Sequence, residues 1–181
     1  MHLGADIIKC ALRLLALQPL KWHYFWGKCI AWIVRVPLRY RKDVVMINLA
    51  RSFPEKKYRE LEDIAVKFYG HLGRIIAETV WFAGSYIKNR LEDSGICHYS
   101  NLEALSELFD KAPSVMLMTS HAGNWEILGG CMHYRSLTKS GTFSFTEEEI
   151  SIVYKKLSNK TMDRVMRHNR CTPVKADWSN C

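Results

Sequence analysis

The chain has 181 residues, a length that suits one domain with a hydrophobic core. Apolar residues make up 48% of it and six residues are Trp, which excludes a disordered chain. The net charge of +8 is unevenly spread, with +7 on residues 1–42, −4 on residues 43–154 and +5 on residues 155–181. Two basic ends around an acidic middle indicate two separate contacts with anions. No nucleic-acid-binding motif accompanies them and the first basic end is rich in Trp, so a membrane surface is favoured over nucleic acid.

The cysteines indicate a reduced chain on the cytosolic side. They form no C-x-x-C pair and show no regular spacing that would predict disulfides or a zinc site. The sequence also has no H-E-x-x-H motif and no Gly-rich phosphate loop, so no metal is implied. The six positions are Cys10, Cys29, Cys97, Cys131, Cys171 and Cys181.

Residues 7–36 are apolar but are interrupted by basic side chains, so they never reach the roughly 18 uncharged residues of a clean membrane span. Three basic residues recur at seven-residue steps, which keeps them on one face of a helix to within about 20° per step. They are Lys21, Lys28 and Arg35. The aromatic residues on the other faces include Trp22, Trp26 and Trp32. A basic, Trp-rich amphipathic helix is typical of the lipid headgroup region, and residues 1–42 are therefore predicted to be a membrane-associated helical segment.

Two alternatives remain open for this segment. A buried helix could extend its Lys side chains along apolar surface to water, and a true span could cover residues 7–36. No small-residue cleavage site follows, so a removable signal peptide is not predicted.

Two helices are predicted in the next part of the chain. Residues 44–50 read as a short helix, and the Ser-x-x-Glu sequence at residues 52–55, which contains a Pro, predicts a helix start. Over residues 58–80 apolar side chains recur at three- and four-residue steps. This pattern predicts a long helix that ends near Gly84.

The second half of the chain alternates between predicted strands and predicted helices. The strands are short apolar or β-branched runs at residues 95–99, 114–119, 150–154 and 173–176. The helices are predicted at residues 101–109, 125–132 and 159–170, with a polar loop at residues 136–149. Such alternation predicts an α/β fold over residues 43–181, a mostly parallel sheet with flanking helices.

His121 and Glu126 are the candidate catalytic pair. His121 follows the predicted strand at residues 114–119, and a turn then leads into a helix whose first turn holds Glu126. Residues five apart on one helix point about 140° from each other, whereas a strand, a turn and a helix can bring them together. Open α/β sheets bind ligands at this end of a strand. The structural alternative is a strand-end histidine satisfied by backbone and an acid favoured by a helix N-terminus.

Imidazole titrates near neutral pH, so His121 can act as a general base. Glu126 can then orient the ring and stabilise the imidazolium, as the acid of a Ser-His-acid triad does.

Three segments in matching order resemble the lipid A biosynthesis (late) acyltransferase family of the lysophospholipid acyltransferase superfamily. They are NLARSFPE at residues 48–55, HAGNWE at residues 121–126 and VYKKLSNKTMD at residues 153–163. The resemblance covers nearly the whole chain, and it implies transfer of a fatty acyl group from a thioester directly to a hydroxyl of a lipid A precursor. Acyl carrier protein or coenzyme A would carry the acyl group, and no other cofactor is implied.

The resemblance also implies a place on the cytoplasmic face of the bacterial inner membrane. Members of the family run on for roughly another hundred residues, about half a typical domain. Residues 43–181 are therefore expected to be the N-terminal part of an acyltransferase domain.

Candidate substrate-binding residues lie mostly in the basic C-terminal segment, and the resemblance implies a role for one of them. Arg170 matches an arginine that is expected to contact phosphate or the thioester carbonyl, although the glycine and second arginine usual beside it are replaced here. Three more cations suit an anionic glycolipid acceptor: Lys155, Arg164 and Arg167. Asn124 is predicted to bind substrate as well. The alternative for these cations is a solvated surface.

Two other functions remain open. Glycerolipid (lysophospholipid) acylation would use the same His-x4-Glu pair with a different acceptor. A truncated, inactive remnant that only binds membranes would use the basic segments without the chemistry.

Overall fold

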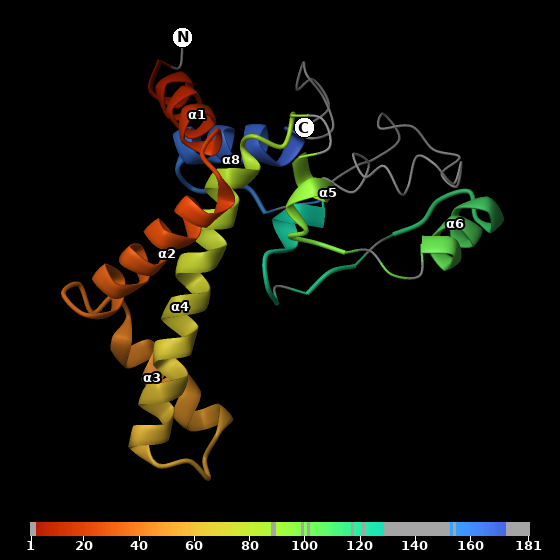
Figure 1. Ribbon diagram of the computed structural model, residues 1–181. Coiled ribbons are helices and arrows are strands. Elements are labelled where there is room, and N and C mark those ends of the chain that lie inside the picture. The colour runs from red at the N-terminus through yellow and green to blue at the C-terminus, as the bar shows by residue number, and fades with distance from the viewer. Residues whose placement is uncertain are drawn as a thin grey trace. The chain divides into compact units, whose positions relative to one another are not determined.

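A computed structural model describes residues 3–87, 90–98, 100, 102–116, 118–120, 122–128, 153 and 155–172 (Figure 1). The chain divides into two compact units, one made of Met1–Gln18 with Thr79–Cys181 and the other of Pro19–Glu78. The boundary predicted at residue 42 on functional grounds stays a prediction.

Regular structure in the described residues is helical, and the predicted α/β fold with a parallel sheet is wrong. The helices are α1 (Leu3–Ala16), α2 (Leu20–Arg35), α3 (Lys42–Ser52), α4 (Tyr58–Phe82), α5 (Arg90–Ser94), α6 (Leu102–Lys111) and α8 (Lys160–Cys171). The backbone is irregular at residues 95–98, 114–116 and 118–120, where two strands were expected. The other two predicted strands, at residues 150–154 and 173–176, lie outside the described residues except for the irregular Val153.

The run at residues 114–119 shows why its apolar character was misleading. A strand is stable only where its backbone groups pair with a neighbouring strand, and the described ranges contain no such ladder. Met116 and Met118 are 83% and 89% exposed instead of packing into a core. The length and apolar character of residues 114–119 suited a strand, but they gave no evidence of a partner strand.

Four predicted helices are confirmed, with shifts at their ends. The predictions at residues 44–50, 58–80, 101–109 and 159–170 correspond to α3, α4, α6 and α8. The start predicted at residues 52–55 is wrong, because α4 begins at Tyr58. The backbone N–H of Lys57 donates to Glu60 Oε2 at 3.0 Å, which satisfies a free donor at this helix start.

The apolar N-terminal stretch at residues 7–36 forms two helices with a break at residues 17–19. Pro19 at the break is extended, with φ −57° and ψ 144°, and α2 begins immediately after it. No helix in the described part of the chain combines the length and the apolar character needed to cross a membrane.

In the unit Pro19–Glu78, α2 and α4 cross at a pair of glycines. A Cβ added to Gly73 would lie 2.2 Å from the carbonyl oxygen of Gly27, and one added to Gly27 would lie 2.6 Å from the carbonyl oxygen of Gly73. The next neighbours of these positions are the methyl groups of Ala31 and Ala77. The two backbones therefore touch directly, with no room for a side chain between them.

Two tyrosines secure the same unit with polar contacts. Tyr69 donates its hydroxyl to the carbonyl oxygen of Tyr40 at 2.7 Å, which holds the turn between α2 and α3 against α4. Tyr24 on α2 donates to Glu78 Oε1 on α4 at 3.0 Å. Burial, and then the negative charge of Glu78, raise the pKa of Tyr24 to about 12, so this hydroxyl remains a donor at neutral pH.

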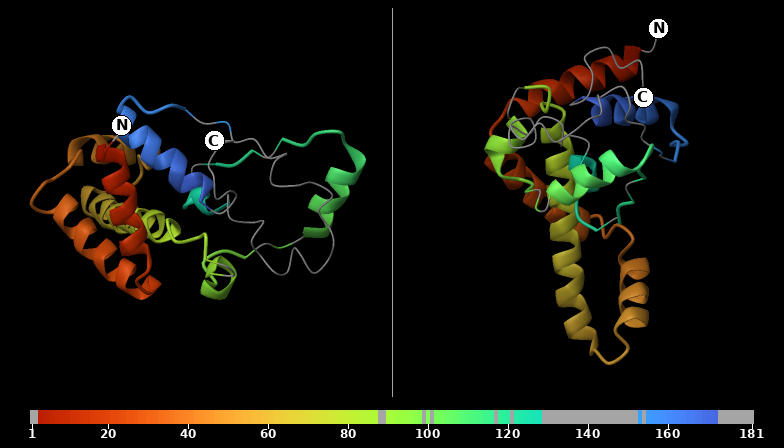
Figure 2. Two further views of the ribbon diagram at one scale, coloured as in Figure 1. Left: turned by 90° about the horizontal axis from the view of Figure 1, so that it is seen from above. Right: turned by 90° about the vertical axis from the view of Figure 1, so that its right-hand side faces the viewer.

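In the unit of residues 3–18 and 79–172, α1 packs against α8, and Figure 2 shows the two helices side by side. Arg90 ties the end of α1 to the residues that follow α4. Its guanidinium donates to the carbonyl oxygen of Ala16, in the last turn of α1, and lies 4.5 Å from the ring centroid of Trp81. A cation at this end of a helix also interacts favourably with the helix dipole.

His168 on α8 should make stability depend on pH. Its pKa is lowered from 6.5 to about 4, chiefly by burial and further by Arg13 and Lys9 on α1, with Asp6 acting in the opposite direction. Between pH 6.5 and 4 the unfolded chain binds the proton and the folded chain does not, so the free energy of unfolding should fall as pH falls. The full shift is worth about 3 kcal/mol, which we discount to about 2 kcal/mol because the ring is partly exposed.

Urea denaturation of wild type and His168→Gln at pH 7.5 and pH 4.5 measures this effect. The variant should lose the part of the pH dependence that His168 contributes, whereas His71→Gln, at an exposed position on α4, should keep it. Parallel pH profiles for wild type and His168→Gln would contradict the assignment.

Candidate functional site

Glu126 lies in a short 3-10 turn at residues 125–128, which begins where a helix start was predicted. Gly123, just before this turn, has a φ of +73°, a left-handed conformation that favours glycine. The carbonyl oxygen of Asn124 accepts from the backbone N–H of Ile127 at 3.3 Å and closes the turn. His121 lies outside the described residues, so its predicted contact with Glu126 stays a prediction.

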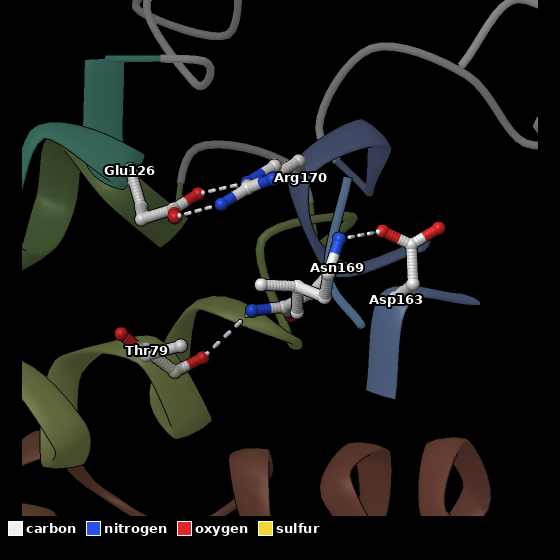
Figure 3. A network of polar contacts seen from close by, with 6 residues as sticks. Thr79, Glu126, Asp163, Asn169 and Arg170 are labelled. Atoms are coloured by element: carbon white, nitrogen blue, oxygen red, sulfur yellow. Dashed lines mark hydrogen bonds and ion pairs between the residues drawn. The ribbon is translucent and has the colours of Figure 1, made fainter. Parts of the chain in front are cut away.

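Arg170 holds both oxygens of the Glu126 carboxylate (Figure 3). Arg170 Nε donates to Oε2 and Nη2 donates to Oε1, each at 2.7 Å. The side chains of Arg170 and Glu126 are only 14% and 11% exposed. The guanidinium carbon also lies 5.1 Å from the ring centroid of Trp125, the residue before Glu126. Paired, charge-assisted bonds of this kind fix orientation as well as distance.

Local contacts explain why α8 begins where it does. Asn159 is the N-cap, and its Oδ1 accepts from the backbone N–H groups of Thr161 and Met162, both at 3.0 Å. Asp163 is buried in the first turn and accepts from the backbone N–H of Leu157 at 2.8 Å. The segment that leads into α8 is therefore held against the first turn of this helix by a hydrogen bond.

The last turn of α8 is hydrogen-bonded to the end of α4. Asn169 is buried, and its Nδ2 donates to the carbonyl oxygen of Thr79 at 3.0 Å (Figure 3). Val165, one turn earlier, is 1% exposed and belongs to the core. Arg170 follows Asn169 directly, so the side chain that reaches Glu126 comes from a restrained turn.

A family model of bacterial lipid A biosynthesis acyltransferases matches residues 4–172. This chain belongs to that family. The match includes all three segments on which the resemblance was based, so the predicted family is confirmed. No curated protein and no solved structure matches the chain.

In this lipid A acyltransferase family member, the predicted substrate-binding cations fall into two groups. Lys155, Arg164 and Arg167 are exposed and form no ion pair with another described residue. Arg170 is mostly buried and engages Glu126 with two of its nitrogens. Only the first three cations are therefore accessible to an anionic acceptor in this structure.

The pairing of Glu126 with Arg170 was not predicted from the sequence. Both residues were candidates, but for separate roles, and 44 positions separate them in the chain. Neither helical periodicity nor motif spacing relates positions so far apart. The contribution of Asn169, which anchors the turn that carries Arg170, was missed for the same reason.

Proposed function

We propose that this acyltransferase moves a fatty acyl group from a thioester to a hydroxyl of a lipid A precursor. The observation that carries the proposal is the family match over residues 4–172, which includes the HAGNWE segment. The setting of Glu126 supports a functional carboxylate at this segment. Its side chain is only 11% exposed and both of its oxygens accept hydrogen bonds, which suits a carboxylate that must keep a fixed orientation. The acyl donor is a thioester of acyl carrier protein or of coenzyme A.

The proposed reaction needs a base and no enzyme nucleophile. The acceptor oxygen attacks the thioester carbonyl carbon while His121 takes the hydroxyl proton. Glu126 orients the imidazole and stabilises the imidazolium that forms. The tetrahedral intermediate then breaks its carbon–sulfur bond, and the thiolate leaves with the proton from His121.

Purified wild-type protein, a radiolabelled acyl thioester and a lipid A precursor test this proposal directly. Label should pass to the precursor, and mass spectrometry should find a product heavier by one acyl group. Parallel reactions with lysophospholipid acceptors test glycerolipid acylation, and a product from those acceptors alone would replace the proposed substrate. Transfer to none of them with either donor would favour a membrane-binding protein without this activity.

We place the protein at the cytoplasmic face of the bacterial inner membrane, with α2 at the lipid surface. Trp22, Trp26 and Trp32 are 51%, 53% and 59% exposed, and Lys21 and Lys28 are exposed as well. Phe25, also exposed, makes edge contacts with the first two Trp rings at centroid distances of 6.2 and 5.3 Å. Exposed Trp beside cations supports contact with anionic headgroups.

Replacing Lys21, Lys28 and Arg35 by Gln should weaken binding to anionic vesicles by about a hundredfold, since each cation near such a surface is worth on the order of 1 kcal/mol. Sedimentation with vesicles of rising anionic lipid content measures the change. The matched control replaces three exposed cations of α3 and α4, Arg51, Arg59 and Lys67, by Gln and should bind nearly as wild type does. Equal pelleting with neutral vesicles in high salt would instead indicate apolar insertion.

A further inference from the structure

Arg170 forms a buried ion pair with Glu126, which is a role other than the substrate contact expected for it. Its Nε and Nη2 both point at Glu126, at 2.7 Å each, so one of the two guanidinium edges that can form paired bonds is already engaged. An acceptor phosphate could take this edge only by displacing a carboxylate that is itself 11% exposed. Loss of either member of such a pair leaves an uncompensated buried charge, so displacement is unfavourable.

The surroundings of the pair restrict both partners. The ring of Trp125 lies 5.1 Å from the guanidinium carbon, and Glu126 is the next residue along the chain. On the other side, Asn169 anchors the last turn of α8 to the carbonyl oxygen of Thr79. The guanidinium therefore connects the last turn of α8 to the turn at residues 125–128. Its two hydrogen bonds fix the orientation of the Glu126 carboxylate.

We infer that Arg170 is a positioning residue, which holds the Glu126 carboxylate in the orientation required for general-base catalysis. This inference rests on the proposed function, in which Glu126 acts on the histidine of the same motif. A carboxylate oxygen that accepts one bond from Arg170 retains a second lone pair, so the pairing does not prevent Glu126 from accepting a ring N–H. Recognition of acceptor phosphates is left to the exposed cations Lys155, Arg164 and Arg167.

Steady-state kinetics of Arg170→Gln and Arg170→Lys test the inference. Arg170→Gln should lower kcat by on the order of tenfold to a hundredfold with little change in KM for the acceptor, because a misplaced catalytic group slows the chemical step. Arg170→Lys should fall between wild type and Arg170→Gln, since an ammonium cannot form the paired bonds of a guanidinium. Arg59→Gln makes the same chemical change at an exposed position of α4 and should match wild type.

Chemical rescue of Arg170→Ala separates positioning from a purely structural effect. Methylguanidinium should restore part of kcat by binding where the side chain was, whereas methylurea, which has a similar shape and no charge, should not. If Arg170→Ala does not fold, as judged by circular dichroism, the comparison of Arg170→Lys with wild type decides alone.

The outcomes distinguish this inference from the proposed function. An inactive wild-type protein, or a His121→Ala variant that keeps its activity, would overturn the proposed dyad and the inference with it. An active wild type whose Arg170→Gln or Arg170→Lys variant raises only KM, with kcat unchanged, would overturn the inference alone and return Arg170 to substrate binding.

Discussion

Replacing His121 by Ala is expected to lower acyl transfer by on the order of a hundredfold to ten-thousandfold, the range that a positioned general base contributes. Without the imidazole, the acceptor hydroxyl must attack with its proton still attached or transfer it to water. Binding of donor and acceptor does not need the ring, so the loss should fall on kcat. Release of labelled product under saturating donor and acceptor measures it.

A histidine elsewhere in the chain provides the control for this variant. His71 is exposed on α4, and His71→Ala should transfer acyl groups at the wild-type rate. Both variants should unfold at the wild-type urea midpoint, which excludes loss of structure as the cause. Near-normal turnover by His121→Ala would remove this residue from the mechanism and leave the base to be found elsewhere.

Replacing Gly73 by Ala is expected to destabilise the unit Pro19–Glu78 by about 3 kcal/mol, at the upper end of the usual cost of overpacking. The new methyl group would lie 2.2 Å from the carbonyl oxygen of Gly27 and 2.9 Å from the Cβ of Ala31. Since the first of these is backbone, no side chain can rotate away, and α2 must separate from α4. Urea denaturation followed by far-ultraviolet circular dichroism measures the change.

Gly70 offers a matched substitution three residues earlier on α4. A Cβ added there would meet no atom within 4 Å, and the position is exposed. Gly70→Ala should therefore stabilise the helix by about 1 kcal/mol, because Ala is the better helix former. The same chemical change should thus differ by about 4 kcal/mol between the two sites. Equal effects at Gly70 and Gly73 would show that the helices do not cross in this way.

The helices were the part of the fold that could be predicted. Apolar side chains at three- and four-residue steps defined α4 over Tyr58–Phe82, and Asn159 marked the start of α8 at Lys160. These signals are local, because a helix makes its hydrogen bonds within one segment. The predicted sheet had no comparable basis, since each strand requires a partner strand, and that partner can lie anywhere in the chain.

The candidate site was predicted in part. The HAGNWE segment and its neighbours were sufficient to identify the family, which the match over residues 4–172 confirmed. Glu126 and Arg170 were both chosen as functional residues, yet their contact was not foreseen. Their side chains meet across 44 positions of the chain, where the last turn of α8 lies beside the turn at residues 125–128.

The sequence by itself determined the family and the local helices, because both depend on residue types at short, regular spacings. Only the tertiary structure decided that Gly73 meets Gly27, that Arg170 binds Glu126 and that residues 114–116 and 118–120 remain irregular. The physical reason is that close packing and ion pairing act between atoms that are near in space. Such contacts depend on which segments fold against each other, and no short-range pattern of residues records that choice.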